Sequence, residues 1–163
     1  MWILALSDGP TALRDQPVDE RANGIRQAFV DRLFRDVCAI RLVRIRNRQR
    51  NDGRLLVDVR TRPEWDFVGK VPGSLLIEWQ SYPNSQPNPS FLDELTARAG
   101  KSDILMFLCR SGARSHAAAA AASNMGYSES YNVLQGFEGD KDAQGHRASV
   151  GGWQFAGLPW SQG

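Results

Sequence analysis

The chain has 163 residues, which is enough for one domain with a short extension and too few for two full domains. With 42% hydrophobic residues it can bury a core without covalent or metal cross-links. Its two cysteines exclude a disulfide framework and a thiolate-only metal site. The apolar run at residues 2–6 is too short for a signal peptide or a membrane span. We therefore expect a cytoplasmic protein without a membrane partner.

The net charge of +2 is unevenly distributed along the chain. Residues 1–54 carry eleven arginines, no lysine and seven acidic side chains, which gives +4, whereas residues 55–163 carry −2. The excess peaks at residues 41–54, where it fits either an electrostatic arm for nucleic acid or an anionic surface, or a solvated amphipathic segment. We favour the second interpretation, because charge asymmetry alone is weak evidence for a binding partner. Residues 55–163 give little reason to expect a nucleic-acid partner.

The first third of the chain carries one predicted helix. Residues 1–23 lack a sustained apolar period and contain two prolines, which predicts a loop. In residues 24–43 apolar side chains recur at spacings of three and four, which predicts an amphipathic helix. Cys38 lies in this helix and is interpreted as a small core residue, with a resolving thiol as the alternative. We assign residues 1–54 to an arginine-rich extension and residues 55–163 to the main domain.

Three short apolar runs predict buried strands, at residues 55–59, 104–108 and 131–134. Between the first two, residues 81–89 read as a loop. A helix then follows, with Asn88 as its cap, Pro89 in its first turn and Gly100 at its end. Strands that alternate with helices indicate βαβ crossovers. The sequence therefore predicts an α/β fold with a mainly parallel sheet and helices on both faces.

The most informative segment is L-C-R-S-G-A-R-S-H, in which Cys109 directly follows the second strand. The alanines at residues 117–122 favour a helix, and Gly126 supplies its end. The loop therefore joins the carboxyl end of a strand to the amino end of a helix, which is where ligands bind in open α/β sheets. Gly112 lets the loop curl, so that successive backbone amides converge on one point and form an anion nest.

Cys109 is the candidate nucleophile. Helix N-termini and nearby arginines favour the reactive thiolate form of a cysteine, and Arg110 and Arg114 are the local guanidinium groups. A thiolate in a cradle of amides can attack a sulfur or phosphorus centre and hold the transferred group covalently. The alternative is a buried, inert cysteine. The surrounding arginines, serines and glycine favour the nucleophile.

The spacing of the loop separates two chemistries. A phosphatase-type loop has five residues between its cysteine and its arginine, which would require arginine at position 115, and it commonly has histidine before the cysteine. This chain has Ser115 and Leu108 there, and only four residues separate Cys109 from Arg114. The tighter ring suits a single sulfur atom better than a phosphoryl group with three equatorial oxygens.

Three blocks of the sequence together resemble the rhodanese-like sulfurtransferase family over about residues 55–160. The first contains D-V-R-T-R-P-E-W, Asp58–Trp65, and G-K-V-P-G-S, Gly69–Ser74. The second is the active loop C-R-S-G-A-R-S, Cys109–Ser115. The third contains N-V-L-Q-G-F-E-G, Asn132–Gly139, and G-W-Q-F-A-G-L-P, Gly152–Pro159. The resemblance implies a three-layer rhodanese-like fold with a mainly parallel central sheet flanked by helices.

The resemblance also implies a persulfide mechanism. Cys109 takes a sulfane sulfur from an anionic donor such as thiosulfate and passes it to cyanide or a thiol, without a metal ion or cofactor. The residues implied to bind the substrate are Arg110, Ser111, Gly112, Ala113, Arg114 and Ser115. Their amides cradle the outer sulfur, while the two arginines attract the donor. Asp58, Arg60 and Glu64 are implied to form one mutually dependent structural ion-pair set near the loop, because an unpaired buried charge is costly.

The sequence departs from the family pattern in two places. Lys70 stands where the family often has histidine, which weakens an acid or base role there. Residues 139–151 form a polar insertion that contains His146 and Arg147 and is either a lid or, as we favour, a solvated surface loop. His116, just inside the helix, is expected to face solvent.

Two other functions stay open at this point. One is a rhodanese-like module for binding or regulation, with the N-terminal extension engaging a protein partner. The other is a phosphatase or arsenate reductase on the same scaffold, which the short loop disfavours.

Overall fold

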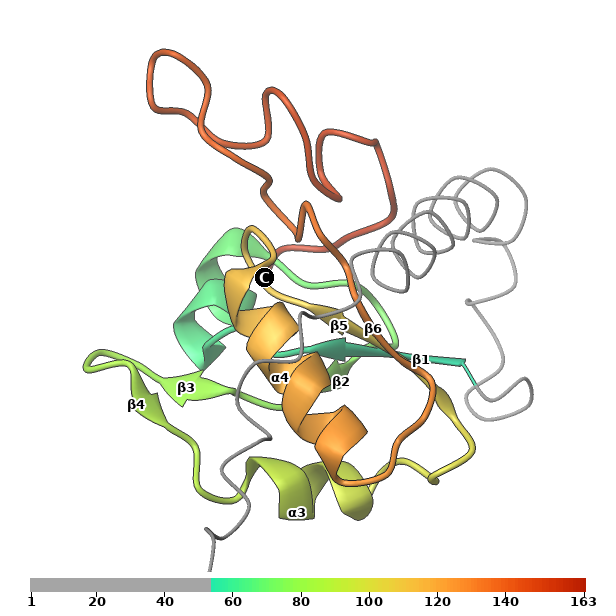
Figure 1. Ribbon diagram of the computed structural model, residues 1–163. Coiled ribbons are helices and arrows are strands. Elements are labelled where there is room, and N and C mark those ends of the chain that lie inside the picture. The colour runs from blue at the N-terminus through green and yellow to red at the C-terminus, as the bar shows by residue number, and fades with distance from the viewer. Residues whose placement is uncertain (1–53) are drawn as a thin grey trace, which may run out of the picture.

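The computed structural model describes residues 54–163, drawn in colour in Figure 1. The predictions for the N-terminal loop, the helix over residues 24–43, Cys38 and the arginine-rich run before residue 54 lie outside the described residues. In chain order the elements are β1 (Arg54–Asp58), the π-helical turn η1 (Glu64–Val68), β2 (Leu75–Leu76), β3 (Gln80–Ser81), β4 (Gln86–Pro87), α3 (Phe91–Thr96), β5 (Ile104–Leu108), α4 (Ala113–Asn124) and β6 (Ser130–Asn132).

Four strands form a parallel sheet in the order β2-β1-β5-β6. Strand β1 pairs with both β2 and β5, and β5 pairs with β6, all in the parallel sense. The non-consecutive order requires crossovers, and α3 and α4 lie in the connections between sheet strands. The predicted α/β architecture with a mainly parallel sheet is therefore confirmed.

The observed elements differ from the predicted ones mainly at their ends. Strand β5 has the predicted bounds, whereas β1 and β6 each begin and end one or two residues earlier than predicted. Residues 80–87 form a small antiparallel hairpin where a loop was expected. Helix α3 begins at Phe91 rather than at Pro89, because the Oδ1 atom of Asn88 accepts the backbone N–H of Ser90 and closes a turn before the helix.

The helices of this part of the chain are short. Helix α4 has twelve residues and follows Gly112, whose φ of +97° turns the chain into the helix as the sequence predicted. Within residues 54–163 no helix combines the length and the hydropathy that crossing a bilayer would need.

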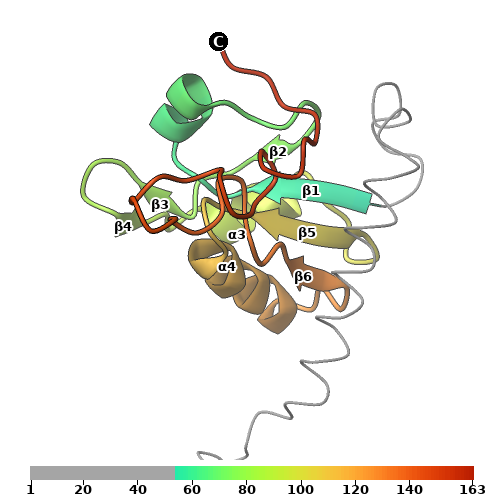
Figure 2. The same ribbon diagram turned by 90° about the horizontal axis from the view of Figure 1, so that it is seen from above.

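The sheet is buried on both faces, by different kinds of structure. Helices α3 and α4 cover one face, and residues from 133 onward lie over the other (Figure 2). Side chains alternate along β5, so that Leu105 and Phe107 pack toward the helices while Leu108 packs toward the C-terminal segment. The C-terminal face is closed by Val71, Val133, Phe137, Trp153 and Leu158. Within residues 54–163 the result is three layers, of which the third is mostly irregular chain.

Candidate active site

Cys109 lies at the carboxyl end of β5, where the chain turns into α4. Its sulfur accepts a hydrogen bond from the backbone N–H of Gly112 at 3.2 Å. The Oγ hydroxyl of Ser115 lies 3.1 Å from this sulfur and 3.1 Å from the Gly112 carbonyl oxygen, so its single proton is shared between these two acceptors. Only 2% of the Cys109 surface is exposed, and Ser115 is fully buried. The sulfur therefore sits at the floor of its loop, held by two donors that stabilise negative charge on it.

Three carbonyl groups of the loop accept hydrogen bonds from an outer segment of chain. The Cys109 carbonyl accepts the N–H of Phe137 at 2.8 Å, and the Arg110 carbonyl accepts the N–H of Glu138 at 2.9 Å. The Gly112 carbonyl accepts the Nδ2 atom of Asn132 at 3.1 Å. In a trans peptide the next N–H points opposite to its carbonyl, so the amides that follow these carbonyls point away from the outer segment. This is the orientation that an amide cradle needs.

Arg114 is held in a bidentate ion pair with Glu64 of η1. Its Nη1 and Nη2 atoms donate to the two carboxylate oxygens at 2.7 and 2.6 Å. Burial raises the pKa of Glu64, but the hydrogen bonds from Arg114 and Thr61 outweigh burial and hold this pKa at about 2. The hydrogen bonds that Arg114 donates to Glu64 in turn raise the pKa of Arg114. Arg114 is thus a fixed wall of the site with its charge compensated, whereas the neighbouring Arg110 is exposed.

The ion-pair set expected from Asp58, Arg60 and Glu64 is divided in the structure, which corrects that prediction. Among the residues that the structure describes, Arg60 forms its ion pair with Asp58 alone, through Nε and Nη2 at 2.7 to 3.2 Å, and both side chains are fully buried. Its Nη2 also donates to the Gly69 carbonyl at 2.7 Å. Glu64 instead accepts the N–H and hydroxyl of Thr61, both at 2.8 Å, and this turn aims its carboxylate at α4.

Sequence reasoning missed the residues that support the loop from outside. The motif at residues 132–139 was recognised, but no pattern indicates which of its backbone groups meet which loop carbonyls. Gly136 is the clearest case, because a Cβ atom there would lie 2.5 Å from the Cys109 carbonyl oxygen. Glu138 was also missed. Its side chain is half-buried next to the loop, and burial raises its pKa while the charge of Arg110 opposes the shift.

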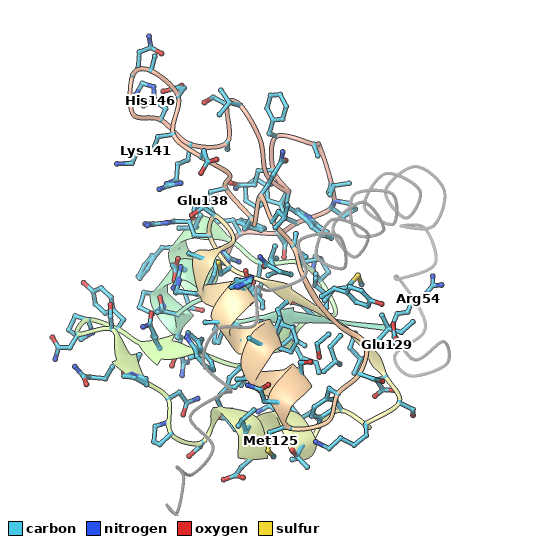
Figure 3. All side chains as sticks on the ribbon, viewed as in Figure 1. Arg54, Met125, Glu129, Glu138, Lys141 and His146 are labelled. Carbon is cyan, nitrogen blue, oxygen red and sulfur yellow. The ribbon has the colours of Figure 1, made fainter. Side chains whose placement is uncertain are left out.

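The two histidines of this part of the chain are exposed, whereas Lys70 and Arg147 take part in hydrogen bonds with backbone groups. His116 is exposed, as predicted. Lys70 forms a two-way backbone bridge with Ser161 near the C-terminus, at 2.8 and 2.9 Å. Figure 3 shows His146 at the far end of the insertion, where 77% of its side chain is exposed. Arg147 instead folds back to donate to the Gly139 carbonyl.

The insertion is built around one carboxylate. Asp142 accepts the backbone N–H groups of Gln144 and His146 and the hydroxyl of Ser149, at 2.8 to 3.0 Å. The hydrogen bond from Ser149, the largest cause, and those from the backbone lower the pKa of Asp142.

Within residues 54–163 no three His, Cys, Asp or Glu side chains lie together in a way that could hold a metal ion. The chemistry that the site can offer is that of a thiolate nucleophile among N–H and O–H donors.

Comparison with known proteins gives concordant matches. A sequence model of the rhodanese-like domain matches residues 43–143, which include Cys109 and its loop. An uncharacterized protein of Rickettsia rickettsii is 40% identical over 111 residues, covering 64% of this chain and 86% of the relative. One of Rickettsia conorii is 39% identical over the same length. The crystal structure of Rv0390 from M. tuberculosis is similar with a TM-score of 0.63 and 44% identity, covering 69% of this chain and 87% of that chain.

Proposed function

Because the chain belongs to the rhodanese-like family, we propose that it is a sulfurtransferase that uses Cys109 as its nucleophile. The substrates in this proposal are a small sulfane-sulfur anion, such as thiosulfate, as donor and a thiol or cyanide as acceptor. The single observation that carries it is the pair of donors on the Cys109 sulfur, at 3.2 and 3.1 Å. An inert core thiol has no need of two such donors.

The reaction proceeds in two displacements. The Cys109 thiolate attacks the sulfane sulfur of thiosulfate, a new S–S bond forms, and sulfite leaves with the electrons of the bond that breaks. An acceptor then attacks the outer sulfur of the persulfide, and the Cys109 sulfur leaves as a thiolate. The N–H of Gly112 and the hydroxyl of Ser115 stabilise the negative charge on Cys109 at the start and end of this cycle.

Arg114, which is paired with Glu64, and Arg110, which is exposed, have different roles in this proposal. Arg114 cannot offer its full charge to a donor, because Glu64 already neutralises it. Arg110 directly follows Cys109 and is exposed, and in this proposal it is the residue that attracts the anion. The 2% exposure of Cys109 restricts the reaction to donors that present a small terminal sulfur.

The test is the covalent intermediate itself. Full-length protein is incubated with thiosulfate, and its intact mass is measured. We expect a gain of about 32 daltons in the wild type and none in Cys109→Ser, since a hydroxyl is a far weaker nucleophile than a thiolate. An unmodified wild-type mass with several sulfane donors would overturn the proposal.

The near-complete burial of Cys109 favours one alternative, a rhodanese-like module that binds or regulates a protein partner without transferring sulfur. In that case the thiol stays unmodified by thiosulfate, and Cys109→Ser binds the partner as well as the wild type does. For a phosphatase or arsenate reductase, turnover of an aryl phosphate or arsenate is the corresponding measurement. The short loop, with Ser115 in place of an arginine, argues against that activity.

A further inference from the structure

Glu138 is fixed between the active loop and the insertion by its own backbone. Its N–H donates to the Arg110 carbonyl at 2.9 Å, and its carbonyl accepts the N–H of Ala148 at 2.7 Å. Figure 3 shows its side chain beside the loop, at the base of the insertion. The backbone of Glu138 is therefore tied to Arg110, the residue that directly follows Cys109.

The Glu138 carboxylate is surrounded by charges that are mostly committed elsewhere. The charged groups that act on it are Arg110, Arg60, Glu64 and Arg147. Arg60 is paired with Asp58, and Arg147 donates to the Gly139 carbonyl. Among the residues that the structure describes, no group donates a hydrogen bond to the Glu138 carboxylate, although it is half-buried. Burial therefore dominates and raises the pKa of Glu138, and Arg110, Arg60 and Arg147 only partly offset it.

A half-buried carboxylate without a hydrogen-bond donor has a free proton-accepting site. We propose that Glu138 accepts the proton of a neutral thiol as that thiol attacks the outer sulfur of the Cys109 persulfide. The proposal rests on the sulfur-transfer function above and specifies its acceptor as an uncharged thiol. Arg114 is already paired with Glu64, so it does not compete with the thiol proton for the Glu138 carboxylate.

The step balances without a further reagent. The thiol S–H bond breaks, and its proton goes to a Glu138 carboxylate oxygen. The thiol sulfur bonds to the outer sulfur, the S–S bond to Cys109 breaks, and its electron pair stays on Cys109 as a thiolate. The product is the acceptor persulfide, and Glu138 returns its proton to water. Sulfite dianion brings no proton of its own and so needs no base for the same displacement.

The test compares these two acceptors on the same loaded protein. Full-length wild type, Glu138→Gln and Glu129→Gln are loaded with thiosulfate and freed of excess donor. Transfer to 2-mercaptoethanol and to sulfite is then followed by loss of the persulfide mass. Glu129 is the control, because it is an exposed glutamate at the opposite end of the sheet (Figure 3).

We expect the ratio of the thiol rate to the sulfite rate to fall about tenfold or more in Glu138→Gln at neutral pH and to stay unchanged in Glu129→Gln. The deficit of Glu138→Gln should shrink as the pH approaches the thiol's own pKa, because solvent then supplies the thiolate. A purely structural role would lower both rates together at every pH. Equal ratios in loaded wild type and Glu138→Gln overturn this inference alone, whereas a wild type that never loads overturns the proposed function.

Discussion

The active loop has an inner and an outer side, and the two are built differently. On the inner side, Cys109 directly follows β5, Gly112 directly precedes α4, and Ser115 lies in the first turn of α4. On the outer side, residues 132–153 are mostly irregular chain, yet their backbone and amide groups bind the loop carbonyls of Cys109, Arg110 and Gly112. The comparison indicates that the inner side places the sulfur and the outer side orients the peptide dipoles around it.

The largest effect that we predict comes from a substitution at Gly136, on the outer side of the loop. With φ at +64°, an added Cβ would lie 2.5 Å from the Cys109 carbonyl oxygen and 2.6 Å from the Arg110 carbonyl carbon. Gly136→Ala should lower the free energy of unfolding by about 3 kcal/mol or more, from backbone strain plus displacement of the loop, and abolish persulfide formation. Chemical denaturation and intact mass measure the two effects.

Gly157→Ala is the matched control, because Gly157 has a φ of +67° but nothing within 4 Å of the added Cβ. It carries the strain without the collision and should keep full persulfide formation. An equal loss of stability and of persulfide formation in both variants would mean that backbone strain, rather than contact with the loop, explains the effect.

A substitution of Glu64 tests its ion pair with Arg114, which holds Arg114 as a fixed wall of the site. Glu64→Gln leaves the half-buried Arg114 without its counter-charge and should cost about 2 kcal/mol of unfolding free energy at neutral pH. Because folding lowers the pKa of Glu64 from 4.5 to about 2, its contribution is complete above about pH 4.5 and is lost as the pH falls toward 2. The stability difference between wild type and variant, measured by urea denaturation, should therefore narrow across that interval.

Asp66→Asn removes an ion pair of the same turn, with Arg62, whose side chains are 51% and 81% exposed. Because solvent screens that pair, the loss should stay under about 0.5 kcal/mol at every pH. A loss as large as that of Glu64→Gln would contradict the assignment of Arg114 as a fixed wall.

The smallest predicted effect is on the inner side. Ser115→Ala removes the hydroxyl that donates to the Cys109 sulfur at 3.1 Å and should slow alkylation of Cys109 by iodoacetamide about tenfold at neutral pH. Ser123→Ala, an exposed serine on the same helix, is the control and should leave the rate unchanged. An undiminished rate in Ser115→Ala would mean that the N–H of Gly112 suffices to support the thiolate.

The inner side was predictable because its signals are local. A continuous apolar run gave the bounds of β5, and an alanine-rich stretch between two glycines gave α4 to within a residue at its end. The small hairpin at residues 80–87 was missed, since its four strand residues are polar or proline and carry no alternation. Strand ends also shifted, because pairing with neighbouring strands rather than propensity decides where a strand stops.

The contacts that surround the loop were not predictable in the same way, because they join residues far apart in the chain. The pairing of Glu64 with Arg114 spans 50 positions, and only the fold brings the two together. The resemblance to the rhodanese-like family implied that Glu64 would join Asp58 and Arg60. The Thr61 turn instead aims the Glu64 carboxylate at α4.

The buried Arg60 has a dynamic consequence. Its guanidinium carbon lies 3.9 Å from the centre of the Phe137 ring, and the N–H of Phe137 donates a hydrogen bond to the Cys109 carbonyl. Lifting the segment around Phe137 would expose a charge pair to water and free that carbonyl at once, so this region should open only as one cooperative unit. In native-state hydrogen exchange the amides of Phe137 and Val59 should then share one high opening free energy. Reagents would reach the sulfur through side-chain fluctuations at the rim while the segment stays closed.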